Sequence, residues 1–217
     1  MRPPISPHAT TLARKTDDWF RRANAVLLGQ LPCRAGCAHC CIGMFPITRL
    51  DAHLLQEGLA GLPESDRTRI ATRAAQQIAA VESAHPVLES SPSLEGWSDA
   101  EIDRVTDAFH DARCPALTDN DQCSLYAYRP LACRSMGIPT RDHGIMNGAC
   151  AVQTFLPIVR LPDSFASEEE ALARQESAEL AMLPEVAVQG EEILLPYGFV
   201  FFEPERNHGT AFDSDHR

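Results

Sequence analysis

The sequence predicts a mainly α-helical protein whose helices are tied together by an irregular, cysteine-rich segment, with a small β-hairpin near the C-terminal end. Apolar residues recur on a 3.6-residue period in several stretches, which is typical of helices with one buried face. Helix-start signals precede two of these stretches. From Cys114 to Cys150, by contrast, no period persists and turn residues alternate with cysteines. That segment therefore needs something other than a hydrophobic stripe to hold it.

The elements are expected in the following order. Thr48 with Asp51, and Ser98 with Glu101, have the spacing of capping boxes. The predicted helices cover residues 9–29, a short stretch after Thr48 closed by Gly58 and Gly61, residues 64–84, a stretch from Ser98 through Phe109, and residues 167–183. The Pro- and Ser-rich residues 85–97 are expected to form a loop. Two late apolar runs, EEILLP and YGFVFFE, are expected to pair as the hairpin.

The length of 217 residues suits one domain or one domain with an appendage. Residues 1–160 would form a cysteine-cluster domain with its core at residues 30–150. Residues 161–217 would add a helix, short strands and a polar tail.

Charge and hydropathy exclude several classes of partner. The formal net charge is −11, so neither nucleic acid nor an anionic membrane surface is an expected partner. The first fifteen residues lack the apolar run and cleavage site of a secretory signal. The longest late apolar run, residues 197–202, is too short to span a bilayer. We therefore expect a cytoplasmic protein, in which thiols stay reduced and clustered cysteines favour metal binding or catalysis over disulfides.

The eight cysteines fall into two groups of four, and this grouping predicts a metal site. Cys33, Cys37, Cys40 and Cys41 lie in the nonapeptide CRAGCAHCC, and Cys114, Cys123, Cys133 and Cys150 lie in the irregular segment. Thiolates are preferred ligands of zinc and of iron–sulfur clusters, and four of them complete such a site. The sequence leaves open which metal is bound and whether the two groups form one site or two. It also leaves open whether Cys41 or Cys150 is a spare buried thiol.

A radical-SAM cluster loop is a competing interpretation, because Cys33, Cys37 and Cys40 have its C-x3-C-x2-C spacing. Position 39 is histidine where that motif usually has an aromatic residue, and five cysteines would be left unexplained. No alternation of strands and helices follows. The spacing alone therefore does not carry this interpretation.

The chain resembles the cysteine-cluster family called CxxCxxCC, or YkgJ-type, a zinc- or iron-chelating domain. The resemblance rests on CRAGCAHCC, on Pro46–Thr48, on CPAL at Cys114, on CSLYAYRPLACRSMG at Cys123 and on Cys150. It covers about residues 30–150. The first spacing here is three residues instead of the family's two, which affects the role of Cys33. The resemblance implies that the chain binds a metal or a cluster through these cysteines.

Three functions are compatible with this resemblance. The first is a metal-binding protein that holds zinc or an iron–sulfur cluster. The second is a cluster-dependent protein-modifying enzyme similar to flagellin lysine N-methylases, and the third is a structural zinc module that docks a protein partner. No catalytic triad, paired carboxylates or G-x-G step is present, so no catalytic residue is assigned and a binding protein is favoured over an enzyme.

Two arginines and two tyrosines near Cys133 complete the candidate site. Arg129 and Arg134 are expected to donate to local carbonyl groups or to offset the negative charge of a thiolate site. Tyr126 and Tyr128 are expected to pack over it. His39 is expected to be a neighbour of the site and not a ligand.

Overall fold

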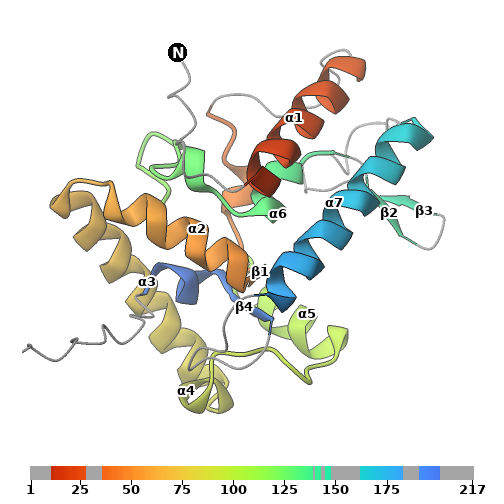
Figure 1. Cartoon of the computed structure of the whole chain (residues 1–217). Coiled ribbons are helices and arrows are strands. Elements are labelled where there is room, and N and C mark those ends of the chain that lie inside the picture. Colours follow the sequence, from red (N-terminus) through yellow and green to blue (C-terminus); the bar gives the residue numbers. More distant parts are fainter. Residues whose placement is uncertain are drawn as a thin grey trace, which may run out of the picture.

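The computed structural model describes residues 11–27, 36–138, 140–142, 145–147, 162–182 and 191–200, and the chain is mainly helical (Figure 1). Its α-helices are α1 (Thr11–Val26), α2 (Arg49–Ala60), α3 (Glu64–Ala84), α4 (Val87–Ser90), α5 (Asp99–Ala108), α6 (Leu131–Ser135) and α7 (Asp163–Ala181). The 3-10 helices are η1 (His39–Cys41), η2 (Tyr126–Tyr128) and η4 (Leu195–Phe199), and the strands are β1 (Pro46–Thr48), β2 (Thr140–Asp142), β3 (Ile145–Asn147) and β4 (Glu192–Leu194). The predicted fold class is confirmed.

The two predicted helix starts are present. Thr48 precedes α2, and its hydroxyl oxygen accepts a hydrogen bond from the backbone N–H of Asp51 over 3.3 Å. Ser98 precedes α5, and its backbone N–H donates to the Glu101 carboxylate over 2.8 Å. Each bond satisfies a donor that the first turn of a helix leaves unpaired. Gly58, predicted to close α2, instead lies within it, and Gly61 follows its last residue.

The strands pair differently from the predicted hairpin. β4 does arise from the first apolar run, but it pairs antiparallel with β1, and Ile47 lies opposite Ile193. The next residues form the 3-10 helix η4, which has Pro196 in its first turn, and proline cannot donate to a strand ladder. The end of the second apolar run, residues 201–203, lies outside the described residues. Inside the predicted irregular segment, β2 and β3 pair antiparallel, and Arg141 lies opposite Met146.

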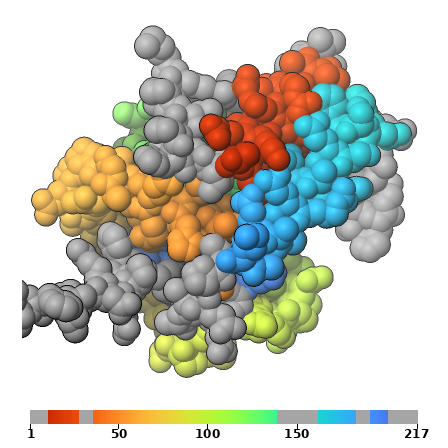
Figure 2. Space-filling view, in the orientation of Figure 1, coloured from red at the N-terminus to blue at the C-terminus, as the bar shows by residue number. Residues whose placement is uncertain are grey.

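Two regions of the core position the cysteines. In the larger region, Leu55 of α2, Ile70 of α3 and Phe199 of η4 are almost fully buried together. In the smaller region, Leu12 of α1 and Leu131 of α6 pack with residues of α2 and α7. In Figure 2, α1 and α7 lie against each other on the visible face of the molecule. Because Leu131 packs with residues of both α1 and α2, the short helix α6 is held between these two helices.

Within the described residues, no helix combines the length and the apolar character needed to cross a membrane. The proposed boundary between residues 160 and 161 stays a prediction.

Candidate metal centre

The chain turns sharply directly after Cys40 and Cys41, the last two cysteines of the first group. Cys40 and Cys41 lie in η1, and Gly43 follows with a φ of 104°. A Cβ atom at Gly43 would lie 3.3 Å from the carbonyl oxygen of His110. Only glycine adopts that backbone conformation readily, so the chain can pass close to the segment after α5.

Backbone hydrogen bonds join this loop to the second cysteine group. The N–H of Cys114 donates to the carbonyl of Cys41 over 2.8 Å, and the N–H of Gly43 donates to the carbonyl of Ala112 over 2.8 Å. Residues 42–113, which number 72, separate the two cysteines in the sequence. The main chain therefore brings the two cysteine groups together.

A compact turn carries Cys114 and Cys123. The N–H of Leu117 donates to the carbonyl of Cys114 over 2.9 Å, and Leu117 forms an isolated β-bridge with Cys123. Arg73 of α3 donates to the carbonyl of Leu117 over 2.7 Å. Asp121 lies at the tip of the turn with a φ of 56°. The TDNDQC stretch is thus a turn anchored to α3.

Cys133 lies in the short helix α6. Its first backbone N–H, at Leu131, donates to the carboxylate of Asp51 over 2.6 Å. Asp51 belongs to the first turn of α2, and its side chain is almost fully buried, with 1% of the residue exposed. Burial is the main cause that raises the pKa of Asp51 to about 7. This carboxyl group fixes the start of α6 against α2.

The electrostatics show which thiols share one neighbourhood. Burial raises the pKa of Cys114 to about 12 and raises the pKa values of Cys123 and Cys133. The charges of the other thiols raise these values further: Cys114 and Cys40 act on Cys133, and Cys123 acts on Cys114. The charges of Cys40, Cys114 and Cys133 also raise the pKa of Cys41, so five thiols from the two groups share one neighbourhood.

The adjacent pair in η1 behaves differently. A hydrogen bond from the Cys41 thiol lowers the pKa of Cys40 to about 7, and Arg129 adds a favourable charge. The same bond raises the pKa of Cys41, because losing its proton would break the bond. Cys40 is thus the thiol in this pair that ionises first.

The described thiols are close without forming a closed ligand set. All six described cysteines, Cys37 included, are free and partly buried. Within the described parts of the chain, no three His, Cys, Asp or Glu side chains form a group that could hold a metal ion. Cys33 and Cys150, two of the predicted ligands, lie outside the described residues.

An ion network flanks the thiols. Arg129 donates to Asp17 of α1 over 2.8 Å, and Arg134 pairs with the other oxygen of the same carboxylate. Arg134 also donates to the carbonyls of Arg129 and Ala127, over 3.0 Å and 2.8 Å. Its side chain is 1% exposed, and burial lowers its pKa. The expected bonds to local carbonyl groups are present, and no pattern in the sequence predicted the partner in α1.

The remaining predicted neighbours take distinct positions. The guanidinium of Arg129 lies over the Tyr126 ring, 4.0 Å from the ring centroid. Tyr128 packs against α2, where a Cβ atom at Gly58 would approach its Cβ and Cγ to 2.7 Å. His39 is exposed in η1.

The comparison with known families follows this geometry. Residues 32–151, more than half of the chain, match the family model CxxCxxCC, described as "Putative zinc- or iron-chelating domain". No curated protein and no solved structure matches the chain.

Proposed function

The chain belongs to the CxxCxxCC family of zinc- or iron-chelating domains, and on that premise we propose that thiols of both cysteine groups hold one shared zinc ion or iron–sulfur cluster. The centre would lie where η1, the turn from Cys114 to Cys123, and α6 meet. The observation that carries the proposal is the main-chain pairing of the two cysteine groups, in which the N–H of Cys114 donates to the carbonyl of Cys41 over 2.8 Å. The effects of five thiols on one another's pKa values support it.

The donor set fits such a centre chemically. Thiolates are ligands of zinc and of iron–sulfur clusters. In this neighbourhood burial and mutual repulsion keep most of the thiols protonated, since both raise their pKa values. A bound cation would remove the repulsion and release protons from the thiols. When bound, it would cross-link η1 to α6 and add its binding free energy to the stability of the fold.

The two arginines suit the charge of such a centre. Arg129 and Arg134 share one carboxylate, that of Asp17, so a net positive charge remains beside the thiols. Four thiolates around a zinc ion or a cluster carry net negative charge. The arginines would offset that charge and would hold α1 against the site. Cys33, Cys37 and Cys150 complete the set of eight predicted ligands.

The first test is the metal content of the chain purified without oxygen. Zinc, iron and acid-labile sulfide are measured per chain, for the native protein and for Cys40→Ala and Cys133→Ala. If one centre draws on both groups, each substitution removes the whole metal complement. Ser135→Ala is a matched control in α6 and should keep the metal, because the hydroxyl group of Ser135 donates to carbonyls of its own helix, those of Leu131 and Ala132.

Each other outcome has a definite meaning. Loss of about half of the metal in each cysteine variant would show two separate sites and refute the shared centre. Full metal content in both variants would refute these two cysteines as ligands. Iron with matching sulfide in the native chain would identify a cluster and would make SAM binding the next measurement, for the enzyme alternative. Zinc without sulfide would favour a structural module.

A further inference from the structure

The short segment around Cys114 has two edges that face different parts of the molecule. On one edge, the N–H of Cys114 donates to the carbonyl of Cys41, and the carbonyl of Ala112 accepts from the N–H of Gly43. Successive carbonyl groups of an extended chain point in opposite directions. The carbonyls of the alternate residues of this segment therefore point away from the first cysteine group.

Two polar side chains of α3 bind this second edge. Gln77 donates to the carbonyl of Arg113 over 2.6 Å, and Arg73 donates to the carbonyl of Leu117 over 2.7 Å. Gln77 and Arg73 are four residues apart, so they lie on the same face of the helix. The helix α3 thus bonds to the main chain on both sides of Cys114.

The same face of α3 also reaches the other end of the turn. Arg69, one helical turn before Arg73, donates to the hydroxyl group of Ser124 over 3.0 Å. Ser124 directly follows Cys123. We call Arg69, Arg73 and Gln77 the α3 row. This row bonds to residues that adjoin both cysteines of the turn.

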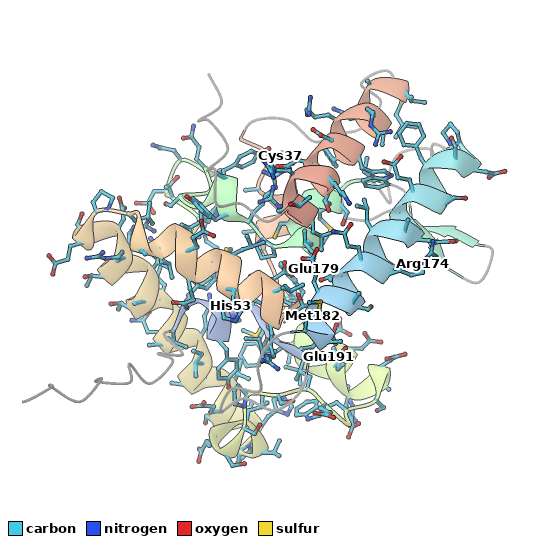
Figure 3. The ribbon with its side chains drawn as sticks, viewed as in Figure 1. Cys37, His53, Arg174, Glu179, Met182 and Glu191 are labelled. Carbon is cyan, nitrogen blue, oxygen red and sulfur yellow. The ribbon has the colours of Figure 1, made fainter. Side chains whose placement is uncertain are left out.

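The α3 row acts on the two thiols through the main chain. The helix α3 contains no cysteine and no histidine, so it offers no thiolate or imidazole ligand of its own. In the view of Figure 3, Cys37 of the first cysteine group lies above α2, whereas most of α3 lies below it. This arrangement agrees with the two edges of the segment facing different partners. The segment is held between the first cysteine group and the α3 row.

The hydrophobic core holds the middle of the turn independently of this row. Ala116 and Leu117 are each 1% exposed, and Leu117 forms its isolated β-bridge with Cys123. Removing one polar side chain of the α3 row should therefore leave the chain folded. The ends of the turn, which carry the cysteines, should open more often, because local opening depends on the contacts of the segment concerned.

We propose that the α3 row positions Cys114 and Cys123 as a preformed pair of ligands, so that the affinity of the metal centre depends on side chains that do not touch the metal. This inference rests on the proposed function, which makes these two thiols ligands. With the row intact, a metal ion does not have to order the turn. Without it, only the fraction of chains with a closed turn can bind, and the apparent dissociation constant rises in inverse proportion to that fraction.

The first measurement is the zinc affinity of the reduced, metal-free full chain, determined by competition with a chromophoric chelator. Gln77→Ala should weaken zinc binding about three- to tenfold, the usual effect of losing one hydrogen bond. Gln76→Ala is the matched control, because Gln76 is the neighbouring, exposed glutamine of the same helix, and it should change the affinity less than about twofold. Urea unfolding gives the folded fraction, and the affinity is expressed per folded chain. A merely structural role would leave that corrected affinity unchanged.

Arg73 provides a second variant with a conservative rescue. Arg73→Ala should weaken zinc binding about tenfold, because a charged donor is lost. Arg73→Lys keeps a donor for the carbonyl of Leu117 and should bring the affinity back to within about threefold of the native value. Equal losses in Arg73→Ala and Arg73→Lys would contradict positioning through this hydrogen bond.

Amide hydrogen exchange in the metal-free chain separates this inference from the metal centre itself. Residues 113–124 should exchange about three- to tenfold faster in Gln77→Ala than in the native chain, and at the native rate in Gln76→Ala. If the native chain bound no zinc, the proposed function would fail, and these exchange rates alone would still decide whether the row positions the two cysteines. Unchanged exchange, unchanged zinc affinity per folded chain in Gln77→Ala and Arg73→Ala, or equal effects of Gln77→Ala and Gln76→Ala would each overturn the role of the α3 row.

Discussion

Replacing Asp51 with asparagine should stabilise the fold at high pH and not at low pH. Asp51 accepts a hydrogen bond from the N–H of Leu131, and an asparagine carbonyl can accept the same bond. What the substitution removes is the ability to ionise. In the fold, burial raises the pKa of this carboxyl from 3.8 to about 7, so ionisation is harder in the folded than in the unfolded chain.

The sign and the size follow from proton linkage. Between pH 3.8 and about 7 the unfolded chain loses the proton while the folded chain keeps it, so the free energy of unfolding falls as pH rises. One pH unit corresponds to about 1.4 kcal/mol. Over about three units the cost reaches on the order of 4 kcal/mol above pH 7. Asp51→Asn should remove this cost.

The assay is urea unfolding of the native chain and of Asp51→Asn at several pH values from 4 to 8. The difference in unfolding free energy between the two should grow steadily up to about pH 7 and then level off. Asp66→Asn is the matched control: Asp66 has the same position in the first turn of α3, but its side chain is 43% exposed. A difference for Asp51→Asn that does not change with pH would refute the reasoning, as would an equal pH dependence for Asp66→Asn.

Two further substitutions test the contacts around the site. Arg134→Ala should lower the free energy of unfolding by about 1–3 kcal/mol, because it removes two buried hydrogen bonds to backbone carbonyls and one of the two arginine partners of Asp17. It should keep the metal, and loss of metal equal to that of a cysteine variant would show a more direct role. The exposed Arg104→Ala should cost under about 0.5 kcal/mol. Gly58→Ala should lower the free energy of unfolding by about 1–3 kcal/mol, because the new Cβ would lie 2.7 Å from side-chain atoms of Tyr128. Thermal unfolding of the two proteins measures this difference. At Gly61, where the nearest atom lies 3.6 Å away, the same change should be tolerated, and equal effects at both glycines would contradict the close packing.

The sequence predicted the features that depend on neighbouring residues. The helices and the caps at Thr48 and Ser98 follow from periodicity and from side chains three residues apart, and the structure has them. The predicted start at residue 167 was four residues late, because α7 begins at Asp163, directly after Pro162. The local sequence therefore predicted which segments are helices better than it predicted where each helix begins and ends.

Features that depend on distant segments were not predictable in the same way. The strand β4 was expected to pair with its sequence neighbour, but β1 lies opposite it. No local pattern marks Asp17 as the partner of Arg129 and Arg134, or Asp51 as the acceptor for Leu131. Asp51 had a visible signal, its place in a predicted capping box, but that signal indicated a local role. For the site, the two cysteine groups were evident from spacing, and their approach through the Cys41–Cys114 hydrogen bond was not.

That main-chain bond between Cys41 and Cys114 has a consequence for the affinity of the proposed metal centre. Closing the 72 residues between Cys41 and Cys114 as a flexible loop would cost roughly 4 kcal/mol of chain entropy. Packing of the core formed by α2, α3 and η4 offsets this cost when the chain folds. A metal ion would therefore bind ligands that folding has already brought together, and its apparent dissociation constant would rise in inverse proportion to the folded fraction. A substitution at Ile70, far from every thiol in the sequence, that unfolds half of the molecules would weaken binding about twofold. Metal affinity would then report the integrity of a hydrophobic core that contributes no ligand.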